Sequence, residues 1–280
     1  MARDILPLVR KALEGRYVVE REIGRGGAAR VFKAQTPEGK AVALKILHPQ
    51  LAASVTADRF LREIKVVAQL VHPGVAQLRD WGEDEWLLWY VMDFVEGPNL
   101  RHHLDRAKRT SVTDALHIAN DLLGALAAAH AIGVVHRDVK PENILLSEPG
   151  AVLVDFGIAK AVAEAGGERL TKSGFAVGTS LYMSPEQIAG DNDIDPRSDL
   201  YSLACVVYEC LAGRPPFDDP FEELVLTKHR TAPVPNVLQF RPETPAAFAK
   251  LLHRALEKSR DQRWPSAADM QEAVLAIARA

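Results

Sequence analysis

Short runs of apolar and β-branched side chains, separated by polar and glycine-containing segments, make up the first third of the chain. Such runs are typical of strands, and the strands predicted from them are residues 17–23, 29–34, 41–46 and 87–94. Residues 57–70 instead carry apolar side chains at three- and four-residue spacing, which predicts a helix. This part of the chain is therefore expected to be a small sheet with one helix.

The pattern changes after Gly97, where apolar residues recur at helical spacing. The helices predicted there are residues 100–108, 112–132, 200–211, 246–256 and 266–278. Two unequal lobes follow, with a hinge at residues 93–97. Ligands favour clefts between lobes, so this junction is the expected binding site.

The first sixteen residues allow two interpretations. Ile5, Leu6, Val9 and Leu13 share one face of a short amphipathic helix, with Pro7 tolerated only in its first turn. The helix is either an arm packed on the small lobe or a segment that binds a partner.

Composition narrows the function classes. The 280 residues carry a formal net charge of -3, and the basic residues are scattered among acidic ones, so nothing supports nucleic-acid binding. The two cysteines, Cys205 and Cys210, lie in an apolar helical run without metal-ligand or disulfide-framework spacing, and both are expected in the core.

No membrane span is expected within the chain. Its longest apolar stretch, residues 203–212, is interrupted by Glu209 and is shorter than the ~20 residues that a spanning helix needs. The start at Met1 lacks the apolar core of a signal peptide, which favours a cytoplasmic domain. A membrane tether beyond Ala280 stays open.

Two further features suggest a phosphate site in the small lobe. Residues 23–31 read IGRGGAARV between two predicted strands, where glycines let the backbone approach phosphates, although a plain hairpin turn has the same composition. Lys45 lies in an apolar strand, where its ammonium group needs an anion. Glu63, on the helix that follows, is either that partner or a surface charge.

The most specific signal lies further along. Residues 136–143 read HRDVKPEN, and residues 155–157 read DFG after a short predicted strand. Two carboxylates and one amide thus fall within about twenty residues, a set that suits divalent cations and the orientation of a hydroxyl group.

In this order, these motifs resemble the protein kinase family over residues 17–280, and their details are similar to the bacterial eukaryotic-like Ser/Thr kinases. The resemblance implies an α+β bilobal fold: a small N-lobe of antiparallel sheet plus one helix (residues 17–95), after the arm at 1–16, and a mainly helical C-lobe (96–280). It implies transfer of the γ-phosphoryl group of ATP to protein Ser or Thr hydroxyls, with Mg²⁺ as the metal and Mn²⁺ as an alternative.

The resemblance also assigns roles in the reaction. Asp138 would be the catalytic base and Lys140 would steady the γ-phosphate. Lys45 would contact the phosphates and pair with Glu63. The metal ligands would be Asn143 and Asp155.

The nucleotide would be enclosed by residues from both lobes, with adenine bonded to the hinge backbone. The residues implied are Ile23, Gly24, Gly26, Gly27, Val31, Ala43, Lys45, Met92, Asp93, Val95 and Leu145. Ala29 stands where the family has its third glycine, and Ala28 where the loop tip is often aromatic, which puts efficiency in doubt and not the reaction type.

Later motifs concern regulation and structure. Arg137 and Lys160 would bind a phosphate on Thr171 or Ser173, added in trans by another copy of the domain, and Thr179 supports Ser/Thr specificity. Further along, Glu186 is expected to pair with Arg263, and Asp199 to hydrogen-bond the catalytic-loop backbone around His136.

Other functions are disfavoured by the same residues. A pseudokinase that serves as a nucleotide-binding or scaffold module would not need this complete set of charged groups. A small-molecule kinase of the aminoglycoside or choline type would lack a segment like residues 178–186, which this chain contains. Pairing of two chains through the N-lobe, the protein substrates and the activating signal stay open.

Overall fold

The computed structural model describes residues 4–26, 29–48, 57–84, 87–156 and 179–280. These residues divide into two compact units. The first contains residues up to 71 together with 76–95, and the second contains residues 72–75, 96–156 and 179–280.

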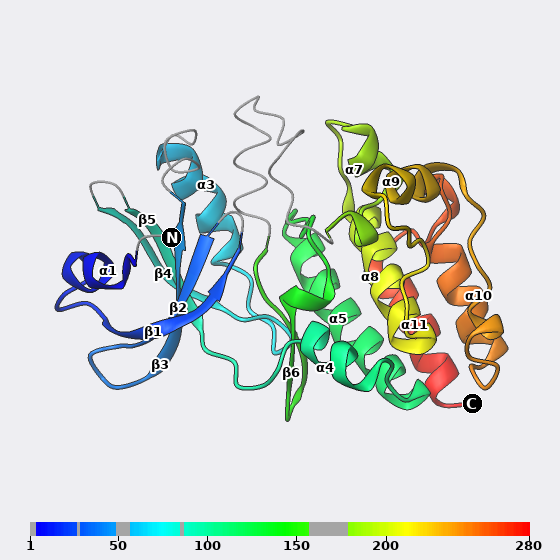
Figure 1. Ribbon diagram of the computed structural model, residues 1–280, viewed down its shortest axis with the longest axis horizontal. Helices are drawn as coiled ribbons and strands as arrows, with labels where there is room; N and C mark the ends of the chain where they lie inside the picture. Colours follow the sequence, from blue (N-terminus) through cyan, green and yellow to red (C-terminus); the bar gives the residue numbers. More distant parts are fainter. Residues whose placement is uncertain (1–3, 27–28, 49–56, 85–86, 157–178) are drawn as a thin grey trace. The chain divides into compact units, whose positions relative to one another are not determined.

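A five-stranded antiparallel sheet forms the first unit (Figure 1). Its strands, in spatial order, are β1 (Val18–Arg25), β2 (Ala29–Gln35), β3 (Ala41–Leu47), β5 (Leu87–Asp93) and β4 (Leu78–Asp84). Every neighbouring pair is antiparallel, which confirms the expected sheet. Strand β4, at the edge, was not among the predicted strands.

Helix α1 (Leu6–Ala12) covers one face of this sheet. Val9 and Leu13 are completely buried, and they share a cluster with Leu44 and Trp89 from β3 and β5. The N-terminal segment is therefore an arm packed on the small lobe, which is the first of the two interpretations.

Helix α3 (Ala57–Val67) packs on the opposite face (Figure 1). Ile64 of α3 is fully buried in a cluster with Ala43 and Met92. Because strand side chains alternate between faces, Lys45 lies on the same side as Ala43, two residues before it. The sheet is thus buried on both faces, and Lys45 lies on the α3 face.

The second unit is mainly helical, and its helices and turns were predicted only in part. The helices are α4 (Leu100–Ala107), α5 (Val112–Ala131), α7 (Pro185–Ala189), α8 (Pro196–Ala212), α9 (Glu222–Thr231), α10 (Ala246–Ala255) and α11 (Ala267–Ala278). Short 3₁₀ turns are η1 (Pro141–Asn143), η2 (Thr179–Tyr182), η3 (Val237–Gln239) and η4 (Arg260–Gln262). Helix α5 packs against α8 and α11. Together with the antiparallel sheet of the first unit, this helical unit confirms the α+β fold class.

Helix α8 is buried along most of its length. It begins four residues before the predicted start, because the Asp195 side chain caps its first turn, and it ends at Gly213, where φ is +76°. Cys205 and Cys210 are fully buried on it, which confirms the core prediction. No helix in the described part of the chain combines the length and apolar character needed to cross a membrane.

Strands β6 (Ile144–Ser147) and β7 (Gly150–Leu153) form a two-stranded hairpin in the second unit. Gly97 approaches this hairpin so closely that a Cβ atom on it would lie 1.9 Å from the carbonyl oxygen of Leu146. Its φ of +139° also excludes residues with side chains. Leu146 in turn donates its N–H to Pro98 (2.9 Å), so the chain after the hinge is fixed to β6.

Candidate functional site

Four residues expected around the nucleotide or its phosphates lie on the α3 face of the sheet. Ala43 and Met92 are buried in the cluster beneath α3, and Val31 packs against that cluster. Lys45 pairs in register with Val31 on one side and Tyr90 on the other, and its Nζ lies 5.7 Å from the Tyr90 ring centroid. The sheet therefore brings Val31, Ala43, Lys45 and Met92 together.

Glu63 lies on α3, in the same unit as Lys45. Its side chain is exposed. The reason is the phase of the helix: Ile64 points into the sheet, and the adjacent position is turned by about 100°. The contact between Glu63 and Lys45 therefore stays a prediction.

The glycine-rich segment connects β1 to β2. Ile23 and Gly24 belong to β1, and the side chain of Ile23 is exposed. The N–H of Gly26 donates to the carbonyl of Ala29 (2.9 Å). Gly27, and Ala28 with it, lie outside the described residues.

The predicted hinge begins at Asp93, the last residue of β5. Its carboxylate accepts hydrogen bonds from Arg79 (2.6 Å) and Lys40 (3.0 Å). Burial raises the pKa of Asp93, but these hydrogen bonds outweigh it and hold the pKa below its ordinary value. The Asp93 N–H already donates to Gln77 (3.0 Å), which leaves its carbonyl group and half-buried Val95 for the expected adenine contacts.

Three polar side chains of the HRDVKPEN segment converge in the second unit. The Nζ of Lys140 lies 2.9 Å from Oδ2 of Asp138. Asn143 donates through Nδ2 to the same Oδ2 (3.1 Å) and to the Asp138 carbonyl (2.8 Å). The side chains of Asp138 and Lys140 are only 17% and 15% exposed, so the carboxylate is held in one orientation.

The backbone of this segment is held from α8. Asp199 accepts the N–H of His136 at Oδ2 and that of Arg137 at Oδ1, both at 2.8 Å. Arg137 has a φ of +64°, a left-handed conformation that is unusual for a residue with a side chain. The predicted role of Asp199 is therefore confirmed.

His136 is completely buried beneath the loop. Its Nδ1 accepts the N–H of Asp138 (3.2 Å), and its Nε2 donates to the carbonyl of Val154 (3.0 Å). Burial lowers the pKa of His136, in agreement with a neutral ring that accepts at one nitrogen and donates at the other. Its ring also lies 4.7 Å from that of Phe156, so it connects the loop to the segment carrying Asp155.

Sequence reasoning did not identify His130. This residue lies near the end of α5, and its Nε2 is 2.8 Å from Oδ2 of Asp199, the oxygen that also receives the His136 N–H. Both side chains are nearly inaccessible, 9% exposed for His130 and 1% for Asp199. No short motif marks His130, because its partner is 69 positions away.

Asn143 and Asp155 offer oxygen atoms suited to a divalent cation. The amide nitrogen of Asn143 is used by Asp138, so the amide oxygen is the atom it can offer. Asp155, like Arg137, has a left-handed backbone (φ +62°). The described residues contain no group of three or more His, Cys, Asp or Glu side chains that could hold a metal by themselves. This donor set fits Mg²⁺, which often takes one or two protein oxygens together with phosphate groups.

The predicted pair of Glu186 and Arg263 is also confirmed. The guanidinium group binds both carboxylate oxygens at 2.7 Å, and neither side chain is more than 5% exposed. Ser198 donates a further hydrogen bond to Glu186. The pair ties α7 to the segment before α11.

The remaining predicted residues are less informative. Leu145 is half-buried in β6, where it pairs with Val152 of β7. Lys160, Thr171 and Ser173 lie outside the described residues.

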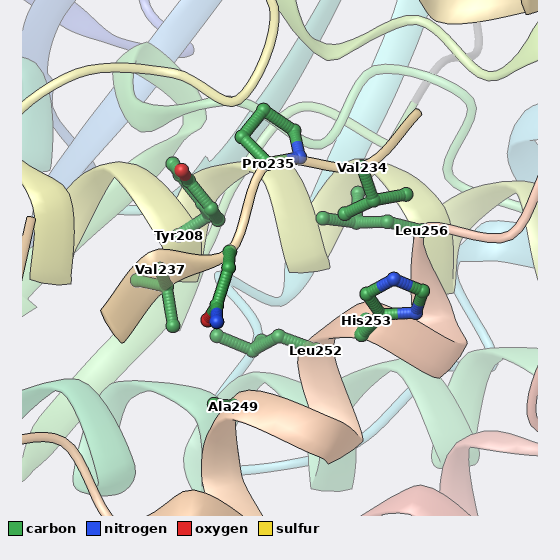
Figure 2. A pocket seen from close by; sticks show the side chains of 9 residues that line it. Tyr208, Val234, Pro235, Val237, Ala249, Leu252, His253 and Leu256 are labelled. Carbon is green, nitrogen blue, oxygen red and sulfur yellow. The ribbon is translucent and has the colours of Figure 1, made fainter. Parts of the chain in front are cut away.

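The second unit contains a small cavity, whose volume is far smaller than that of a nucleotide site (Figure 2). It is lined mostly by apolar side chains of α8, α10 and residues 234–237, and its volume of ≈ 20 Å³ suits about one water molecule. Ligand pockets usually measure ~300 Å³ or more. It therefore offers no competing site for the chemistry of the loop.

Comparison with known proteins agrees with this geometry. The family described as "Protein kinase domain" matches residues 17–275. The serine/threonine-protein kinase PknH of Mycobacterium bovis is 38% identical over 259 residues, which cover 91% of this chain and 43% of PknH. The serine/threonine-protein kinase PknD of Mycobacterium tuberculosis is 38% identical over 260 residues, covering 91% of this chain and 39% of PknD.

A more distant relative gives the same result. The probable serine/threonine-protein kinase PknB of Lactococcus lactis is 34% identical over 264 residues, covering 93% of this chain and 42% of PknB. The chain thus spans about two-fifths of the length of each of these three relatives.

Proposed function

The chain belongs to the protein kinase family, and on that premise we propose that it transfers the γ-phosphoryl group of ATP to Ser and Thr hydroxyl groups of proteins. The observation that carries the proposal is the Asp138 carboxylate, held by Lys140 and Asn143 on a loop fixed by Asp199. Such a carboxylate can accept the proton of an acceptor hydroxyl.

In the proposed reaction, the acceptor oxygen forms a bond to the γ-phosphorus while the bond from that phosphorus to the bridging oxygen of ADP breaks. The hydroxyl proton passes to Asp138. Lys140, whose Nζ lies 2.9 Å from the Asp138 carboxylate, would stabilise negative charge on the transferred group. Most of the rate enhancement would come from this positioning and charge stabilisation.

The nucleotide would bind on the α3 face of the sheet. Val31, Ala43 and Met92 would contact adenine, and Lys45 would contact the phosphates. Asn143 and Asp155 would hold the metal, Mg²⁺ with Mn²⁺ as the alternative, which would neutralise phosphate charge. The other nucleotide contacts proposed are Ile23, Gly24, Gly26, Gly27, Asp93, Val95 and Leu145.

The exposed position of Glu63 is the observation that favours a non-catalytic alternative. A nucleotide-binding or scaffold module would not need Glu63 to reach Lys45. Against this, the loop around Asp138 keeps its hydrogen bonds and buried support, which a scaffold would not require. We therefore retain Glu63 as the proposed partner of Lys45.

Activation is proposed to involve phosphate on Thr171 or Ser173. Arg137, next to the base, and Lys160 would bind that phosphate and so order the segment. The modification would be added in trans by a second copy, with pairing through the N-lobe as the proposed dimer. Thr179 supports the aliphatic hydroxyl groups of Ser and Thr as acceptors, rather than the phenolic hydroxyl group of Tyr.

The cellular setting is proposed from the same family. Protein substrates are implied by the family, while their identity is open. We propose that the domain acts in the cytoplasm and that a region beyond Ala280 could tether it to the membrane, since the relatives it matches are more than twice its length.

A direct assay uses the purified domain, ATP labelled at the γ-phosphate, Mg²⁺ and a generic protein such as casein. Label is expected on Ser and Thr of the added protein, identified by phosphoamino-acid analysis. ATP binding without any transfer would favour the scaffold alternative. Label on a small-molecule alcohol but not on protein would also overturn the proposal.

A further inference from the structure

The peptide between Arg137 and Asp138 decides where the proposed base points. Arg137 holds a left-handed backbone conformation, φ +64°, without being glycine. Such a conformation persists only where the surroundings fix it. The contacts of this peptide therefore control the geometry of Asp138.

Each of three polar backbone groups around this peptide is hydrogen-bonded to a different side chain. The Arg137 N–H donates to Asp199 (2.8 Å), and the Asp138 N–H donates to Nδ1 of His136 (3.2 Å). The third group is the Arg137 carbonyl, which accepts from Nε2 of Gln187 at 2.9 Å. Gln187 lies on α7, fifty positions later in the chain.

The amide orientation of Gln187 is fixed at both ends. Its Oε1 accepts the N–H of Ser184 (3.1 Å), the N-cap of α7, while the Gln187 N–H bonds to Oγ of Ser184 (3.4 Å). A flipped amide would put its oxygen against the Arg137 carbonyl and its NH₂ group against the Ser184 N–H. The capping box therefore aims the Gln187 NH₂ group at the catalytic loop.

We propose that Gln187 is a positioning residue for phosphoryl transfer: it holds the Arg137 carbonyl and so fixes the Asp138 carboxylate, linking the N-terminus of α7 to the base. The inference rests on the proposed function for its kinetic readout. Glu186, the adjacent residue, has a different role, because its carboxylate is buried against Arg263.

Two substitutions isolate the donor. Gln187→Glu keeps the size and the oxygen that caps Ser184 but loses the NH₂ donor. Gln187→Leu removes both polar ends. Loss of one hydrogen bond that orients the base is expected to lower kcat about tenfold at pH 8 in both variants. The KM for ATP should stay within about twofold, because the bond contacts no nucleotide group.

The pH dependence separates positioning from a general structural defect. When the introduced carboxyl group of Gln187→Glu is protonated, it can again donate to the Arg137 carbonyl. The ratio of its kcat to that of the wild type should therefore rise as pH falls from 8 toward 5.5. The same ratio for Gln187→Leu should stay flat.

Gln271 provides a matched control. Its Nε2 also donates to a backbone carbonyl, that of Asn120 (3.1 Å), between α11 and α5. Gln271→Glu is expected to keep wild-type kcat, with a thermal stability change similar to that of Gln187→Glu. Hydrogen exchange, which needs no catalysis, should speed up at residues 136–138 in both Gln187 variants and not in the control.

The outcomes are distinct. Wild-type kcat together with unchanged exchange at residues 136–138 in both Gln187 variants would overturn the inference, as would a kcat loss in Gln187→Glu that does not depend on pH. If the wild type transfers no phosphate, the proposed function fails. Faster exchange in the Gln187 variants would still support the contact with the loop, and unchanged exchange would overturn it.

Discussion

The buried pair of Glu186 and Arg263 provides the most quantitative stability prediction. Arg263 is completely buried, and besides the carboxylate it donates to the backbone carbonyls of Glu257 (2.8 Å), Lys258 (3.0 Å) and Arg197 (3.2 Å). Replacing Arg263 by Met would leave these carbonyls and a buried carboxylate without the guanidinium group.

Removing one partner of a buried ion pair costs about 3–5 kcal/mol. Glu186→Gln should fall at the lower end, because the amide keeps one acceptor for Arg263 and the three carbonyls stay bonded. Arg263→Met should fall at the upper end, because it removes five hydrogen bonds. At roughly 2–4 °C per kcal/mol, Tm would fall by roughly 6–20 °C.

Urea and thermal unfolding followed by circular dichroism would measure these changes. The double variant should lose less than the sum of the single losses, because the pair no longer leaves one charge buried alone. Asp261→Asn is the control: Asp261 is 83% exposed in its pair with Arg197, so its removal should cost less than about 1 kcal/mol. A loss below about 1 kcal/mol for Arg263→Met would refute the reasoning.

Acid provides a second test of the same pair. Burial raises the pKa of Glu186, but the hydrogen bonds and charge of Arg263 outweigh it and lower the pKa below its ordinary value. A carboxyl group with a lowered pKa stabilises the fold above its unfolded pKa, about 4.3, and loses this contribution as pH falls through the folded value. The stability difference between wild type and Glu186→Gln should therefore be constant above about pH 5 and shrink below about pH 4.

Three other predictions follow from single residues. Lys45→Met should nearly abolish transfer while leaving Tm within a few degrees, and more than a tenth of wild-type activity would contradict its role. Gly97→Ala should lower Tm more than Gly133→Ala, because both glycines have positive φ but only Gly97 has a carbonyl oxygen 1.9 Å from the added Cβ; equal losses would contradict this. The Thr171→Ala/Ser173→Ala double variant should lose most of its kinase activity, and mass spectrometry should find no phosphate on residues 171 and 173. Full activity of this variant would exclude the proposed activation.

Much of the sheet could be predicted, since β3 and β5 bury both faces and read as apolar runs. Strand β4 could not, because it lies at the edge and its sequence after Leu78 is mostly polar. Edge strands often carry charged residues, so their sequences resemble loops. Helix α9 was missed for a similar reason. Only Val225 and His229 are buried on it, and its other side chains are exposed or half-buried.

Contacts of the candidate site were easiest to anticipate where the partners are close in sequence. Asp138, Lys140 and Asn143 lie within six residues of one another, and their side chains meet in the structure. Distant partners were harder: resemblance to the family supplied Asp199, but nothing indicated His130 or the contact of Gln187 with the loop. Ser184 and Gln187 fit the S-x-x-Q capping-box pattern, which predicts the cap of α7 but not the second hydrogen bond to Arg137.

The exposed position of Glu63 shows a different limit. The sequence gives the helix and the charges, but the rotation of α3 about its axis is decided by packing, here by Ile64. A rotation of about 100° separates an inward carboxylate from an exposed one. In a helix of only eleven residues, sequence periodicity cannot fix this rotation about the helix axis.

The central claim is that Asp138 is the base of a phosphoryl transfer to protein hydroxyl groups. The most direct test compares wild type with Asp138→Asn in single-turnover transfer from labelled ATP, together with nucleotide affinity by calorimetry. The account predicts label on Ser and Thr by the wild type, a loss of at least about a hundredfold in the chemical step for the variant, and nucleotide affinity within about threefold. Transfer at the wild-type rate by Asp138→Asn, or a loss explained by weaker nucleotide binding, would contradict it.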